Sequence, residues 1–201
     1  MNKHWLMGML SLSLLTILVG CVTTKGRNFN FAHVNSLQLG QTTKQQALEM
    51  FGEPKVEKEV TNDFNDFTLF QYIFVEINSA RPQDSGARLM TLEFVDEKLN
   101  GYYYSATYEG DLGTRNLGGR KRINRQSSAH NDVIREMGQP DGKAYYTTTL
   151  QIFDEGSGEE IWIYNQDTRK EDNSTIAEKT LIGFDRDGVV DNITSSKTKV
   201  N

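Results

Sequence analysis

A short helix that ends at Gly-x-Pro occurs twice in this chain, and this repetition restricts the folds open to it. Leu37–Pro54 reads LQLGQTTKQQALEMFGEP, and Ser127–Pro140 reads SSAHNDVIREMGQP. Gly52 and Gly138 lie 86 residues apart, and each can adopt the left-handed conformation that closes a helix. The proline two positions later prevents the helix from continuing. The pattern therefore predicts one small unit used twice.

The start of each helix is also marked in the sequence. Thr42 followed by Gln45 is typical of a capping box, in which a hydroxyl and an amide satisfy the first backbone N–H groups. In the second copy, Ser127 or Ser128 is the expected N-terminal cap. Apolar residues then recur at helical spacing, so both helices are predicted to bury one face.

Segments rich in aromatic and β-branched residues follow each helix. Thr68–Ile77 is the clearest strand, and Arg88–Val95 with Leu99–Tyr108 predicts a hairpin. In the second half, strands are expected at 143–149, 160–165, 179–184 and 189–194. The predicted fold class is α+β, with two tandem small units, each of short helices packed on an antiparallel sheet.

Composition changes suggest the boundaries of these units. The glycine-rich stretch EGDLGTRNLGG is typical of a linker. The expected organisation is a signal peptide at 1–20, a tether at 21–30, a first unit at 31–108, a linker at 109–119, a second unit at 120–196 and a tail at 197–201.

The N-terminus carries the strongest local signal. Lys3 precedes an apolar run, Trp5–Gly20, that suits a secretory signal better than a membrane span. The sequence Leu18-Val19-Gly20-Cys21 resembles the bacterial lipobox, in which the cysteine is acylated with palmitate-type chains after cleavage. The alternative is a secretory peptide that contains a cysteine by chance. Val22, where an aspartate would favour inner-membrane retention, implies by the same resemblance the periplasmic leaflet of the outer membrane.

Charge and residue content disfavour several other classes. The net charge of −5 argues against nucleic-acid binding, which needs a basic surface. His33 and His130 have no cysteine or histidine at ligand spacing, so no metal and no cofactor are expected. The carboxylates at 154, 155, 159 and 160 bracket a Gly-Ser-Gly turn, and those at 185, 187 and 191 fit a hairpin turn better than a calcium loop. We expect no enzymatic activity.

Two groups of residues are candidates for contact with a partner or with lipid. The first is a basic run in an otherwise acidic chain, comprising Arg120, Lys121, Arg122 and Arg125, with Arg115 nearby. It is either a solvated face or a site for anionic headgroups or an acidic partner. The second group is aromatic, Tyr102, Tyr103, Tyr104, Tyr145 and Tyr146. Aromatic rings anchor interfaces, and packing within the core is the alternative for about half of them.

The pattern Leu39-Gly40-x-Thr42-x-x-Gln45-x-x-Leu48-x-x-x-Gly52-x-Pro54 resembles the SmpA/OmlA (BamE-like) family of outer-membrane lipoproteins. Further similarities are Tyr72 with Phe74, Leu92-x-Phe94, Trp162-x-Tyr164 and Phe184-x-x-x-Gly188. That family carries one unit, whereas this chain is predicted to carry two. A tandem pair is similar instead to the β-lactamase inhibitor protein architecture, whose concave sheet grips an enzyme.

These resemblances imply binding rather than catalysis. The leading interpretation is a lipid-anchored, periplasmic protein-binding module that assists the assembly or integrity of the envelope, with an outer-membrane assembly component as partner. The alternative is an inhibitor or modulator of a periplasmic enzyme. Capture of partners from crosslinked envelopes separates the two interpretations.

Overall fold

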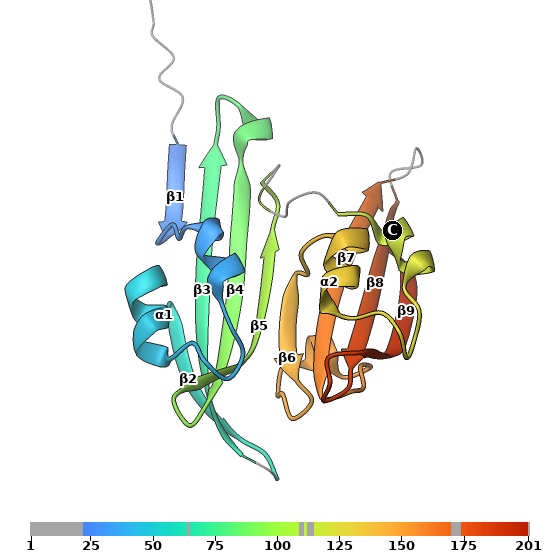
Figure 1. Ribbon diagram of the computed structural model, residues 1–201. Coiled ribbons are helices and arrows are strands. Elements are labelled where there is room, and N and C mark those ends of the chain that lie inside the picture. The colour runs from blue at the N-terminus through green and yellow to red at the C-terminus, as the bar shows by residue number, and fades with distance from the viewer. Residues whose placement is uncertain (1–21, 64, 109–110, 112–114, 170–173, 201) are drawn as a thin grey trace, which may run out of the picture.

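The computed structural model describes residues 22–200, apart from 64, 109–110, 112–114 and 170–173. Its centre is one continuous antiparallel sheet of nine strands, with both α-helices packed on the same side (Figure 1). The sheet order is β1-β3-β4-β5-β6-β7-β8-β9, and β2 pairs with the outer edge of β3 beside β1. The expected α+β class is confirmed. None of the helices among these residues is long and apolar enough to cross a bilayer.

The first half of the sheet contains five strands. Its elements are β1 (Val22–Gly26), η1 (Phe31–Ser36), α1 (Lys44–Phe51), β2 (Val56–Thr61), β3 (Asp66–Asn78), η2 (Pro82–Asp84), β4 (Gly86–Val95) and β5 (Lys98–Ala106). The second half has four strands. Its elements are η3 (Leu117–Arg122), α2 (His130–Met137), β6 (Gly142–Tyr145), η4 (Gln151–Phe153), β7 (Glu160–Arg169), β8 (Thr175–Phe184) and β9 (Val190–Val200). The halves are joined where β5 pairs with β6.

The two halves repeat each other residue by residue around the helices. η1 and α1 recur as η3 and α2 with a constant offset of 86 residues. Gly40 and Gln126 occupy equivalent positions before the helices, with φ angles of 68° and 64°. Gly52 and Gly138 close the helices with φ angles of 76° and 84°. The helix-and-sheet repeat predicted from the Gly-x-Pro motifs is therefore present in the structure.

One tyrosine in each half fixes the helix exit to the sheet. The Tyr72 hydroxyl on β3 donates a hydrogen bond to the Gly52 carbonyl oxygen at 3.0 Å. The Tyr164 hydroxyl on β7 donates to the Gly138 carbonyl oxygen, also at 3.0 Å. Each carbonyl lies at the helix end, where no further turn supplies a backbone N–H. The side-chain hydroxyl of the following strand takes that place.

The helix caps are displaced by one residue from the predicted ones. Thr43, not Thr42, caps α1, and its reciprocal partner is Gln46. The Thr42 hydroxyl instead accepts the Gln38 backbone N–H at 3.0 Å, and stabilises the turn before the helix. In the second half the cap is Ala129, and Asp132 accepts its backbone N–H at 3.0 Å. Ser128 takes the turn-stabilising role of Thr42, accepting the N–H of Asn124.

Three predicted boundaries are corrected by the structure. Residues 22–26 of the expected tether form β1. This strand pairs with the C-terminal part of β3, on the same edge where β2 pairs with the N-terminal part. All five β1 side chains are exposed, so the sequence carries no burial signal there. The expected linker contains the start of η3, and its Gly119 packs closely on α2. Most of the expected tail belongs to β9, which pairs with β8 as far as Val200.

Two apolar cores lie between the sheet and the helices. The first is rich in aromatic rings and includes Phe29, Phe51, Tyr72, Phe94 and Tyr104. The second is formed around Trp162, Tyr164 and Phe184, with Val133 and Met137 from α2. Both cores use the alternate residues of the strands that face the helices. The other alternate residues of these strands point to the opposite, helix-free face of the sheet.

Candidate functional site

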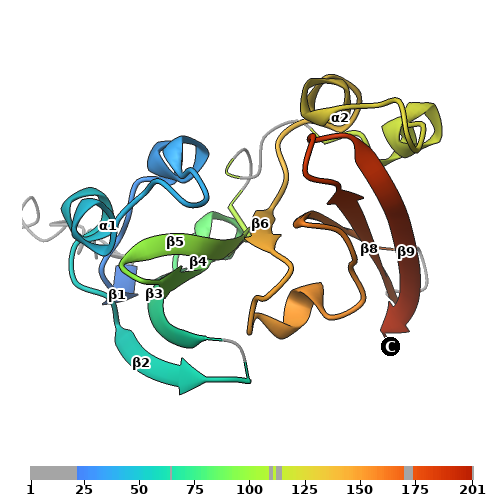
Figure 2. The same cartoon turned by 60° about the horizontal axis from the view of Figure 1, so that its bottom comes forward.

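The helix-free face of the sheet differs between the two halves. In the second half it is covered by residues 146–159, which contain η4. Figure 2 shows η4 on the side of the sheet opposite to the helices. Leu150 and Phe153 pack there on Ala144, Ile161, Ile163 and Leu181. In the first half, by contrast, large apolar side chains of the same face remain exposed.

We call this group the open patch; it consists of the exposed residues Val56, Ile73, Ile77 and Leu89 and the half-buried Val75. Ile73 pairs with Leu89 and Val56 pairs with Gln71, two residues before Ile73 on β3, so their side chains share one face. Ile73, Leu89 and Ile77 are 38%, 40% and 50% exposed. Exposed apolar residues scattered singly are ordinary on a protein surface, whereas a contiguous group on one sheet face is typical of an interaction site.

The equivalent positions in the second half are polar. Tyr72 on β3 is equivalent to Tyr164 on β7, so Asn165 occupies the position that Ile73 has in the first half. Leu92 on β4 is likewise equivalent to Ile182 on β8, so Lys179 occupies the position that Leu89 has in the first half. The repeat has diverged on this face, and also at some helix-facing positions, where Gln166 and Thr180 stand in place of Phe74 and Met90. The helix-free face combines an apolar half and a polar half.

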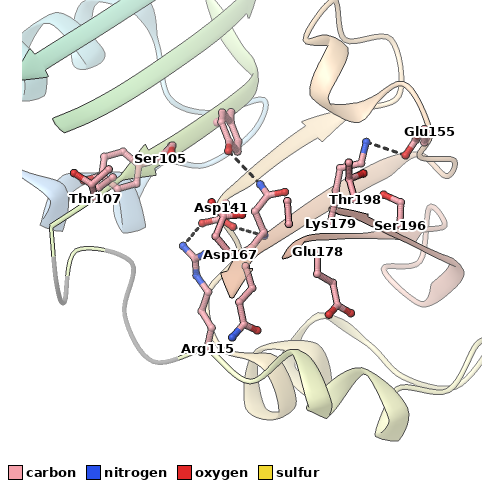
Figure 3. A pocket seen from close by; sticks show the side chains of 16 residues that line it. Ser105, Thr107, Arg115, Asp141, Glu155, Asp167, Glu178, Lys179, Ser196 and Thr198 are labelled. Atoms are coloured by element: carbon pink, nitrogen blue, oxygen red, sulfur yellow. Dashed lines mark hydrogen bonds and ion pairs between the residues drawn. The ribbon is translucent and has the colours of Figure 1, made fainter. Parts of the chain in front are cut away.

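A cleft of about 820 Å³ lies between the two halves, where β5 and β7 continue beyond the short strand β6. Figure 3 shows polar side chains from both halves converging on it. Its lining includes Tyr103, Ser105, Thr107, Arg115, Asp141, Asn165, Asp167, Lys179, Ser196 and Thr198. Ser105 pairs with Leu89 across β4 and β5, so the cleft is continuous with the open patch.

A hydrogen-bonded group organises the cleft floor. Arg115 forms an ion pair with Asp141, and its Nη1 donates to the Asn165 carbonyl oxygen at 2.7 Å. The Asn165 backbone N–H donates to Asp141 Oδ2 at 2.6 Å. The Asn165 side-chain amide donates to the Tyr103 hydroxyl at 3.1 Å, which connects the two halves. These contacts hold the walls of the cleft in fixed positions.

Burial is the main influence on the ionisation of this floor. It raises the pKa of Asp141 to about 7, although Arg115 and the Asn165 N–H act in the opposite direction. Burial also raises the pKa of the Tyr103 hydroxyl. Nearer the rim, Lys179 is paired with Glu155 at 2.8 Å. The cleft therefore offers hydrogen-bond donors and acceptors that suit recognition of polar groups on another molecule. Its lining has more carboxylates (Asp141, Glu155, Asp167 and Glu178) than cations (Arg115 and Lys179).

The predicted contact tyrosines separate into three environments. Tyr102 and Tyr104 are 4% and 1% exposed, because alternate residues of β5 face the helices, so both belong to the core rather than to a contact surface. Tyr103 points to the other face and lines the cleft. Tyr145 and Tyr146 are 37% and 63% exposed and lie at the end of β6, and their contact with a partner stays a prediction.

The basic run does not line the cleft except through Arg115, and Arg120 pairs with Glu178 at the cleft's edge. Arg120 and Arg122 belong to η3 on the helix side, where they pair with Glu178 and Glu136. Arg125 donates to the side chain of Asn192 at 2.9 Å. Lys121 is exposed. These contacts tie η3 to neighbouring elements, and a role of the run in binding lipid stays a prediction. Cys21, the predicted lipidation residue, lies outside the described residues.

Sequence reasoning did not identify the open patch or the Asn165 and Asp141 pair as a site. One signal was available, since Thr68–Ile77 carries apolar residues on both faces of a strand. Such a strand must be covered twice or left with one exposed apolar face. Arg115 was noted only as part of the basic run. Among the described residues, no group of three or more His, Cys, Asp or Glu side chains is placed to hold a metal ion.

Comparisons with known proteins found one similarity, which is to a solved structure. The chain matches none of the protein-family models and none of the curated proteins with which it was compared. The resemblance to the SmpA/OmlA family thus stays a prediction. Among solved structures, it is similar to a candidate β-lactamase inhibitor protein from Streptococcus mutans, with 10% identity and a TM-score of 0.47. The match covers 86% of this chain and 98% of the other.

Proposed function

We propose that this protein is a lipid-anchored binding module of the bacterial envelope, which holds a folded protein partner against its helix-free sheet face. The observation that carries the proposal is the open patch beside the polar cleft. Protein interfaces combine an apolar centre with a polar rim, and the two halves of this face supply these parts side by side. The lipobox-like sequence before Cys21 supports the anchored location.

The shape of this face favours a partner with a projecting loop. The cleft can accept side chains of such a loop, while Ile73 and Leu89 contact the surface beside it. We therefore favour a periplasmic enzyme, which the protein inhibits or modulates. A component of the outer-membrane assembly machinery is the second candidate, because residues 31–194 carry the SmpA/OmlA-like motifs.

Capture from crosslinked envelopes with matched variants tests the proposal. Leu89→Glu places a charge in the open patch, and Asn35→Glu places the same charge on η1, on the helix side. We expect the wild type and Asn35→Glu to capture the same protein in similar amounts. Leu89→Glu should capture much less of it. Equal capture by both variants would contradict binding through this face.

The captured protein decides between the two candidates. A soluble enzyme whose turnover changes when purified wild-type protein is added, but not when Leu89→Glu is added, supports the modulator function. Recovery of assembly-machinery subunits, with slower insertion of outer-membrane proteins in a Leu89→Glu strain, supports the accessory function instead.

A further inference from the structure

Strand β1 begins at the residue that directly follows Cys21 in the sequence. It pairs with β3 from Val22 opposite Asn78 to Gly26 opposite Phe74. At Gly26 the two strands are so close that a Cβ atom would lie 1.9 Å from the Ile73 carbonyl oxygen. The chain after β1 is held equally firmly, because Phe29 is buried in the aromatic core.

A rigid attachment follows from this arrangement. Consecutive Cα atoms are about 3.8 Å apart, so an acyl group on Cys21 would start within one residue of the sheet. A flexible tether would let the protein change its orientation relative to the bilayer, whereas a strand paired with the sheet would restrict that rotation. Figure 1 shows that the start of β1 and the β3–β4 connection lie at the same end of the molecule.

We propose that this end, formed by the start of β1 and the β3–β4 connection, lies directly on the lipid surface and fixes the orientation of the whole sheet. The inference rests on the acylation of Cys21 that is part of the proposed function. β3 has 13 residues, and an antiparallel strand advances about 3.4 Å per residue. The β2–β3 turn at its other end is therefore held about 40 Å from the bilayer, with the open patch and cleft directed sideways.

The surface chemistry of this end suits a membrane interface. Val22 is 53% exposed and pairs with Asn78 at the start of β1, so it projects from the sheet face opposite to Ile77. Val22, which directly follows Cys21, is available to enter the headgroup region beside the acyl chains, whereas Ile77 belongs to the open patch. Lys25 is exposed on the same strand and supplies a cation for anionic headgroups, while Arg81 is paired with Asp84.

Fluorescence quenching on vesicles tests the orientation. The acylated full-length product is purified with one added cysteine for a fluorophore, either Ala80→Cys in the β3–β4 connection or Asp63→Cys in the β2–β3 turn. Both residues are exposed. The protein is inserted into phosphatidylethanolamine–phosphatidylglycerol vesicles that contain headgroup-nitroxide lipid. We expect quenching at position 80 to exceed quenching at position 63 several-fold.

A spacer variant provides the control. Ten Gly/Ser residues between Cys21 and Val22 restore a flexible tether, so the ratio between the two positions should fall toward one. Equal quenching at positions 80 and 63 without the spacer, in protein that does bind vesicles, overturns the orientation while leaving the anchor intact. Protein that carries no acyl chain and stays off the vesicles overturns both the anchor and the orientation.

Discussion

The Glu93 carboxylate on β4 accepts the backbone N–H of Thr149 at 2.7 Å, and so ties the first half of the sheet to the segment that covers the second. Its other oxygen accepts the side-chain amide of Asn100 at 2.7 Å. Glu93 is fully buried, so these donors replace the water that it loses on folding. The contact fixes residue 149 of the covering segment 146–159 to β4 on the helix-free face of the sheet.

Replacing this carboxylate should destabilise the protein. Glu93→Ala removes the acceptor of the buried Asn100 amide and of the part-buried Thr149 N–H, and we expect a loss of about 2–4 kcal/mol in the free energy of unfolding. Chemical denaturation measures the change. Glu57→Ala on β2, where the side chain is exposed, is the control and should change stability by less than about 0.5 kcal/mol. Equal effects of the two substitutions would show that Glu93 does not hold the covering segment.

The two tyrosine contacts at the helix exits should be equivalent. Tyr72→Phe and Tyr164→Phe each remove one hydrogen bond to a glycine carbonyl and keep the ring, so each should cost about 1 kcal/mol. Because the two sites lie in different halves, the double variant should lose the sum of the two values. Denaturation of the three variants measures this; a strongly non-additive double variant would mean that the sites are coupled.

The buried carboxyl of Asp141 should give stability a particular pH dependence. The folded protein retains this proton up to about pH 7, whereas an unfolded aspartate releases it near pH 4. Between these values the folded state binds more protons, so the contribution of Asp141 to stability decreases as pH rises. Asp141→Asn should flatten this decrease between about pH 4 and 7, and exposed Asp63→Asn should leave it unchanged. Stability curves that retain the same slope in Asp141→Asn would contradict the assignment.

Two adjacent glycines test whether residues 117–119 belong to η3 or to a linker. A Cβ on Gly119 would lie 2.0 Å from the Glu136 carbonyl oxygen, so Gly119→Ala must displace η3 from α2 and should cost about 1–3 kcal/mol. At Gly118 the nearest atom is a side-chain oxygen of Asn116 at 3.1 Å, so Gly118→Ala should stay within about 0.5 kcal/mol. Thermal unfolding compares the pair. If both variants are neutral, the segment behaves as a linker.

Only part of the candidate site could be predicted from the sequence. Tyr103 was included because three consecutive tyrosines must face both sides of a strand, but the sequence does not say which side is open. Whether Tyr102 or Tyr103 is buried depends on where the helices pack. The exposure of Ile73 and Leu89 depends on the path of residues 146–159, which are distant in sequence and lie over the other half. The ion pair of Arg115 and Asp141 joins the segment before η3 to the residue before β6, which meet only when the chain folds.

The sequence alone determined where the two repeated helices end, because glycine favours the closing conformation and a proline two residues later prevents the helix from continuing. It also determined the main strands, through their aromatic and β-branched residues. The tertiary structure decided what has no local signature. It decided that the exposed residues 22–26 add a strand to the sheet, that Gly26 and Gly119 are closely packed, and which face of the sheet stays open. Local motifs act through backbone conformation within a few residues, whereas burial depends on segments that the chain brings together only when it folds.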